Sequence, residues 1–250
     1  MAMNEIERKP SVEVMHRTAT GFVDEGLREH LIKVFNYMWI SLCVTAFAAY
    51  AVANTGLLQY MYSINPQAHT AGFSLIGWLV ILSPLALIFA FNYVLQTKSF
   101  AAAQTLFWTF AVMEGASLSS IFVLYTAASL TRVFLITAAT FAAMSLYGYT
   151  TKRDLSKIGS FLFMGLIGLI IASIVNIFMQ SPALYYALSY IGVGIFVGLT
   201  AVDMQNIKNL YYASDSSDTA SRKALAGAMN LYLDFINLFI SLLRIMGDRR

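Results

Sequence analysis

Two aspartates, Asp203 and Asp234, each lie alone in a long apolar stretch. Residues 158–202 contain no Asp, Glu, Lys or Arg, and Asp234 is the one charged residue within 224–243. A carboxylate inside a bilayer costs roughly 3 to more than 10 kcal/mol, so it persists only where it faces protein or water, is paired, or is protonated. An acid in such a stretch therefore indicates a functional site.

The chemistry open to this pair is proton sharing or cation binding. Two carboxylates a few ångströms apart cannot both ionise cheaply, so the pair would share one proton. The shared proton would hold two helices together, and its loss would push them apart, which is a pH-gated latch. No Lys or Arg is placed to neutralise both acids. A bound cation is the alternative, and oxygen ligands favour Ca²⁺ over a transition metal.

Structural interpretations exist for each polar residue of the apolar stretches. Asp203 or Asp234 could instead cap a helix or reach the headgroups. Glu114, in a third stretch, could simply hydrogen-bond Ser117 or a neighbouring helix. Asn237 and similar buried amides more often join helices than form sites. Gly194 and Gly198 have the small-xxx-small spacing that allows close helix packing.

The composition places these residues in a membrane protein. The chain has 250 residues, of which 58% are hydrophobic and 12% charged, whereas soluble domains carry about 25% charged residues. Apolar runs of about 20 residues cross a bilayer as helices, so we expect an all-α polytopic fold following a polar N-terminal tail, residues 1–33. The predicted spans of the 34–250 domain are 34–54, 73–94, 102–124, 133–150, 159–178, 184–207 and 226–246.

Basic residues set the expected orientation. They alternate between successive loops, which places the N-terminus and the even-numbered loops in the cytoplasm. Arg249 and Arg250 break this pattern, but residues 226–246 are long and free of Pro, so a full seventh crossing is expected. Asp203 and Asp234 would then each lie about 12 Å from the cytoplasmic end of their helices, and Glu114 roughly 18 Å deep.

Several other functions are disfavoured. The net charge of +3 gives no indication of nucleic-acid binding, and the single cysteine, Cys43, excludes an intramolecular disulfide or a thiolate metal cage. The three histidines, His16, His30 and His69, lie outside the predicted spans and are expected to be solvated. Neither aspartate has the Gly-x-Gly-Asp context of intramembrane aspartyl proteases, so we expect no enzyme activity and no cofactor.

Four segments resemble the Bax inhibitor 1 family, also called the transmembrane Bax inhibitor motif family. They are the C-terminal segment LYLDFINLF at 231–239, followed by LLRI at 242–245, the segment TAVDMQ at 200–205, the segment EGASLS at 114–119, and the segment TKRDLS at 151–156. The resemblance covers the chain from Lys33 onward, and its form is similar to bacterial members. It implies a seven-helix bundle with six helices around a central C-terminal helix.

The resemblance also implies a function, a pH-sensitive Ca²⁺ leak through the membrane. It makes Asp203 and Asp234 the pH sensor and gate, and it places Glu114, and with it Asn237, on the permeation path. Some relatives carry a basic latch residue in the second helix, which this chain lacks. The expected partners are the lipid bilayer, Ca²⁺ and protons, in a bacterial inner membrane.

Two other functions stay open at this stage. Some bacterial relatives modulate a membrane-bound protease, and the polar N-terminal tail could be the contact segment of such a regulatory protein. A proton-coupled transporter of small solutes is the third alternative.

Overall fold

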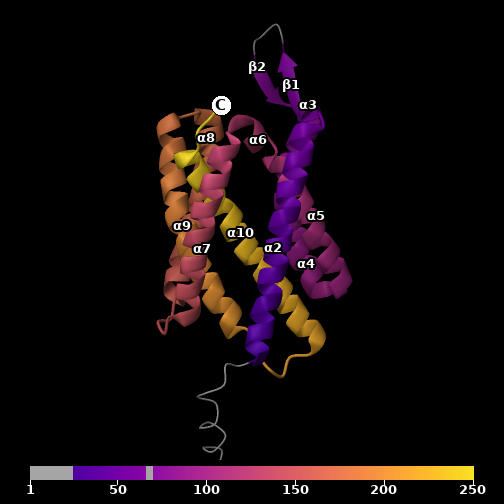
Figure 1. The fold of residues 1–250 in the computed structure, drawn as a ribbon, viewed down its shortest axis with the longest axis vertical. Helices are drawn as coiled ribbons and strands as arrows, with labels where there is room; N and C mark the ends of the chain where they lie inside the picture. The colour runs from indigo at the N-terminus through magenta and orange to yellow at the C-terminus, as the bar shows by residue number, and fades with distance from the viewer. Residues whose placement is uncertain (1–24, 66–69) are drawn as a thin grey trace, which may run out of the picture.

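The computed structural model describes residues 25–65 and 70–250 as a helical bundle (Figure 1). Within these residues, seven spans are long and apolar enough to cross a membrane, which confirms the predicted fold class. The spans are α2 (Glu25–Asn54), α4 (Leu75–Thr97), α5 (Phe100–Leu118) with α6 (Ser120–Leu124), α7 (Ala127–Thr150), α8 (Ser156–Met179), α9 (Pro182–Asn209) and α10 (Ser217–Met246).

Helix α10 lies between two groups of three helices (Figure 1). One group consists of α2, α5 and α4, and the other of α7, α9 and α8. Most residues in the 18-residue apolar segment of α10 are buried inside the protein, whereas no residue in the corresponding segment of α8 is buried. The outer helices α4 and α8 pack mainly on α5 and α9. This arrangement confirms the central C-terminal helix that the resemblance implied.

The first helix begins earlier than the sequence analysis placed it. Helix α2 starts at Glu25 and includes residues assigned to the polar tail. The expectation that His30 is solvated is wrong, because its side chain is buried and its ring lies 5.7 Å from that of Tyr211. The connection between α9 and α10 covers this end of α2, which sequence periodicity does not reveal. His16, His69 and residues 1–24 lie outside the described part of the chain.

The third span is interrupted, although the sequence predicted one helix over 102–124. Ser119 separates α5 from α6, and its hydroxyl donates to the carbonyl of Ala116 over 2.7 Å. Ser117 similarly donates to the carbonyl of Glu114. Serine hydroxyls that bond to nearby carbonyls offer the backbone an alternative to the helix ladder, which weakens the helix locally.

The first loop carries secondary structure of its own. It contains α3 (Leu58–Met61), β1 (Tyr62–Asn65) and β2 (Thr70–Phe73). The strands pair antiparallel, with Tyr62 opposite Phe73. This hairpin projects beyond the bundle at the end where the C-terminus lies (Figure 1).

Two glycines allow close crossings between membrane-spanning helices. A Cβ atom on Gly115 of α5 would collide with the carbonyl oxygen of Thr45 in α2, and one on Gly148 of α7 with that of Ala201 in α9. The predicted packing face on α9 is only half correct. Gly198 faces Leu162 of α8, but nothing lies within 4 Å of a Cβ placed on Gly194.

Candidate functional site

The structure brings Asp203 and Asp234 together between α9 and α10. Their carboxyl groups lie within hydrogen-bonding reach of each other. Asp234 is only 4% exposed, while Asp203 is partly buried. Two carboxylates have only acceptor atoms, so a hydrogen bond between them requires a proton on one of them. The pair is therefore described most simply as singly protonated.

The aspartates meet although they lie at different positions along their helices. Asp203 is about 9 Å from the end of α9 at Asn209, and Asp234 about 26 Å from the beginning of α10 at Ser217, at about 1.5 Å per residue. The prediction of equal distances, about 12 Å each, is wrong. Helix α10 begins earlier than predicted and runs obliquely across the bundle (Figure 1), which brings its middle to the end of α9.

No basic residue pairs with either aspartate in the described part of the chain. The three ion pairs found there join Arg132 to Asp248, Arg222 to Asp218 and Lys223 to Asp215. The Asn206 side chain lies beside Asp203, but the Oδ2 atom of Asp234 is buried without a hydrogen-bond partner. A buried, unpaired carboxylate oxygen is costly when the group is charged, so Asp234 is the carboxyl group of the pair that is better suited to hold a proton.

The polar residues that follow Asp203 fix α9 to its neighbours. The Gln205 amide accepts a hydrogen bond from the Leu155 backbone over 2.9 Å and donates to the Arg153 carbonyl over 2.8 Å. The Lys208 ammonium donates to the Tyr149 carbonyl at the end of α7. These bonds hold α9 against α7 and the loop before α8, whereas Asp203 faces α10. The contribution of Gln205 was not predicted.

Tyr232, two residues before Asp234, faces the other helix group. Its hydroxyl lies 2.7 Å from that of Thr45 in α2, which itself donates to the Ala111 carbonyl of α5 over 2.9 Å. Because Thr45 has one hydroxyl hydrogen, Tyr232 must be the donor to Thr45. The sequence analysis quoted Tyr232 only as part of the motif at 231–239. The signal that the sequence offered for this role was a tyrosine two residues before an intramembrane acid.

The other predicted site residues lie apart from the aspartate pair. Glu114 of α5 is close enough to Tyr232 to interact electrostatically, so it belongs to the side of α10 that faces α2 and α5. The Asn237 amide donates to the Leu233 carbonyl of its own helix. Acidic groups therefore lie on both sides of α10, but only Asp203 and Asp234 contact each other.

The oxygen ligands at the aspartate pair are too few for a resident calcium ion. Ca²⁺ takes six to eight oxygen ligands, and the described residues contain no group of three or more His, Cys, Asp or Glu side chains that could hold a metal. The pair supplies two carboxyl groups with one amide beside them.

The fold and the site define a class of protein, an integral membrane protein of seven helices with a buried acidic pair against its central helix. Residues 27–250 match the model of the family described as "Inhibitor of apoptosis-promoting Bax1". The chain is 45% identical over 227 residues to the inner membrane protein YbhL of Escherichia coli K12, covering 90% of this chain and 94% of YbhL.

Further relatives extend the match to the whole length. A Rickettsia prowazekii protein is 42% identical over 227 residues, covering 91% of this chain and 92% of its own. A Caulobacter vibrioides protein is 38% identical over 250 residues, covering 99% of this chain and 100% of its own. The chain therefore belongs to the Bax inhibitor family, as a bacterial-type member.

Proposed function

We propose that this protein is a passive Ca²⁺ pathway whose gate is the Asp203–Asp234 pair. The observation that carries the proposal is the contact of two carboxyl groups between α9 and α10, without a basic partner, in a position where one of them needs a proton. A pair held by one proton is stable only while that proton is present. The charge of the pair, and hence the contact between the helices, then depends on pH.

Loss of the shared proton supplies the force that opens the gate. Two unit charges about 4 Å apart repel by about 4 kcal/mol at an effective dielectric constant of about 20. An energy of this size shifts a two-state equilibrium about a thousandfold. We expect the closed state when the pair holds its proton and the open state after deprotonation, so Ca²⁺ flux should increase as pH rises.

An apolar cavity lies along the surface between the two helix groups. It has a volume of about 260 Å³ and is lined by residues of α2, α5, α6, α7 and α10, including Thr45, Phe134 and Phe239. No charged residue lines it, so a hydrated ion would not enter it in this conformation. We propose that separation of the two groups widens this cavity into a wet path, along which Glu114 supplies a further acid.

The test is Ca²⁺ uptake by liposomes that contain the purified protein and a trapped Ca²⁺ dye, measured between pH 6 and pH 8. Asp203→Asn and Asp234→Asn each remove the second negative charge, so the steep dependence of flux on pH should disappear. Asp218→Asn is the matched control, because Asp218 is an exposed acid at the start of α10. Unchanged flux and pH dependence in both pair variants would show that this is not the gate.

The orientation and location in the cell are part of the proposal. The loops at 151–155 and 210–216 lie at the end where α2 begins. The first of these loops contains Lys152 and Arg153, and Lys208 lies just before the second. The excess of basic residues favours the cytoplasm for this end, and the name of the YbhL relative favours the inner membrane of a bacterium. Regulation of a membrane protease through the N-terminal tail concerns mainly residues outside the described part.

A further inference from the structure

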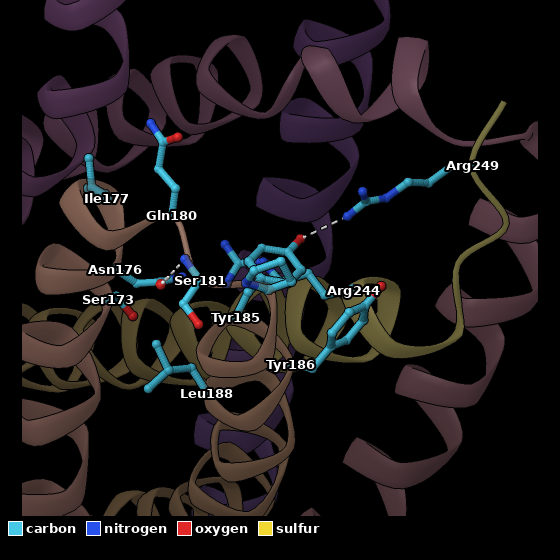
Figure 2. Close-up of a pocket in the computed structure, with 11 residues that line it drawn as sticks. Ser173, Asn176, Ile177, Gln180, Ser181, Tyr185, Tyr186, Leu188, Arg244 and Arg249 are labelled. Atoms are coloured by element: carbon cyan, nitrogen blue, oxygen red, sulfur yellow. Dashed lines mark hydrogen bonds between the residues drawn. The ribbon is translucent and has the colours of Figure 1, made fainter.

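A second cavity, lined by both polar and apolar residues, lies at the end of the bundle away from the aspartate pair. It has a volume of about 570 Å³ and lies between the end of α8, the beginning of α9 and the C-terminal segment (Figure 2). Arg244 of α10 and Arg249 beyond it both line the cavity, and its lining residues include no Asp or Glu. Neither arginine is used by the proposed gate.

Tyr185 holds the two guanidinium groups in one place. The Arg244 guanidinium carbon lies 5.2 Å from the centre of the Tyr185 ring and that of Arg249 lies 5.9 Å from it. Arg249 also donates a hydrogen bond to the Tyr185 hydroxyl over 3.4 Å (Figure 2). Cation–π contacts of this kind orient a guanidinium group without neutralising its charge.

The positive charge is left without a counter-ion from the described residues. Asp248, the acid next to Arg249, pairs instead with Arg132. The cavity also includes Ser181 and Pro182 at the N-terminus of α9, where the helix dipole adds a partial positive charge. Two guanidinium groups near one another repel, so this arrangement favours an anion between them. Arginine forks suit phosphate oxygens in particular.

The remaining lining combines polar residues, among them Asn176 and Gln180, with apolar ones. Ile177 and Leu188 line the cavity beside the arginines. No residue in the 18-residue apolar segment of α8 is buried by the protein. A ligand with a phosphate group and an acyl chain would satisfy both parts of the cavity. We propose that this cavity binds the phosphate group of an anionic phospholipid, with Arg244 and Arg249 as the phosphate ligands.

This site explains an exception in the charge pattern of the sequence. Arg249 and Arg250 lie at the end of the molecule where the positive-inside rule expects few basic residues. The backbone of this segment is fixed by hydrogen bonds from Arg250 to Leu124 and from Thr126 to Asp248. These backbone hydrogen bonds hold Arg249 over the cavity. The position of Arg249 therefore follows from the packing of the C-terminal segment and not from the orientation of the protein in the membrane.

The experiment measures binding of phosphatidylglycerol and of phosphatidylcholine with identical chains to the full-length protein in detergent, by native mass spectrometry. Phosphatidylglycerol should bind more tightly, and Arg244→Gln with Arg249→Gln should weaken it on the order of tenfold for each arginine. Arg250→Gln is the matched control, because Arg250 neighbours Arg249 but does not line the cavity, and should leave the affinity unchanged.

Inorganic phosphate separates the two sources of the anion. If millimolar phosphate binds with the same dependence on Arg244 and Arg249 but the lipid adds no affinity, the site holds a free phosphate and the assignment to a lipid is wrong. Equal binding of both lipids, or equal losses in the double variant and in Arg250→Gln, would overturn the site altogether.

A measurement on the unmodified protein tests the site even if the double variant does not fold. Interactions of exposed charges are screened by salt, with a Debye length of about 10 Å at 0.1 M and about 3 Å at 1 M. Phosphatidylglycerol binding should therefore fall steeply with added NaCl, while phosphatidylcholine binding should not. Binding of phosphatidylglycerol that is indifferent to salt would contradict the proposal. Asp234→Asn should leave lipid binding intact, which separates this test from that of the gate.

Discussion

At the scale of single residues, position on α10 decides which neighbour a polar group meets. Asp234 contacts Asp203 of α9, whereas Tyr232 reaches Thr45 of α2. Residues two apart on a helix point in different directions, so one turn of α10 makes polar contacts with both helix groups. The first contact depends on a proton, and the second is a neutral hydrogen bond. Only the first should respond to pH.

The Tyr232 contact can be tested by removing one oxygen atom. Tyr232→Phe keeps the buried ring but removes the donor to Thr45, and a buried interhelical hydrogen bond in a membrane protein contributes about 1 kcal/mol. The midpoint of thermal unfolding in detergent should fall by about 2 to 4 °C. Tyr147→Phe is the control, because Tyr147 is exposed on α7. Equal midpoints for both variants would contradict a stabilising role for this bond.

At the scale of helices, the polar contacts divide the bundle into two bodies. Gln205 and Lys208 fix α9 to the loop before α8 and to α7. Tyr232 and Arg222 connect α10 to α2 and α4, since Arg222 donates to the Leu95 carbonyl. The aspartate pair joins the two bodies at one end. The C-terminal segment joins them at the other, where the Asp248 backbone donates to Ser129. Repulsion at the pair should therefore open the first end.

The crossing of α7 and α9 should be sensitive to added volume. Gly148→Ala places a methyl group against the Ala201 carbonyl, and overpacking a tight contact costs about 1 to 3 kcal/mol. Gly194→Ala on α9 meets open space and should be neutral or stabilising by up to about 1 kcal/mol, since alanine favours helix formation. Unfolding midpoints of the two variants in detergent check this. A Gly148→Ala protein as stable as Gly194→Ala would contradict the crossing.

At the scale of the whole molecule, the number of crossings is odd. Helix α10 runs from the end where α2 begins to the opposite end, where the C-terminus packs on the start of α7 (Figure 1). We therefore expect the two ends of the described chain to lie on opposite sides of the membrane. The aspartate pair and the arginine cavity lie towards opposite ends of the bundle.

Cysteine labelling in intact cells tests this topology. Cys43→Ser removes the native cysteine, and single cysteines are then introduced at Ser214 in the loop before α10 or at Arg250. A membrane-impermeant maleimide should label the cysteine at position 250 in intact cells, and that at 214 only after the membrane is broken. Labelling of both positions from the same side would mean that α10 does not cross.

The sequence alone determined the number of membrane spans and the identity of the acidic pair. Both follow from the local cost of placing charge in lipid, which one chain segment reveals by itself. Only the tertiary structure decided that α10 is oblique, that α2 starts at Glu25 with His30 buried, and that Tyr232 joins Thr45. These features depend on contacts between distant segments. The arginine cavity is of the same kind, because Tyr185, Arg244 and Arg249 become neighbours only when α9 and the C-terminal segment pack together.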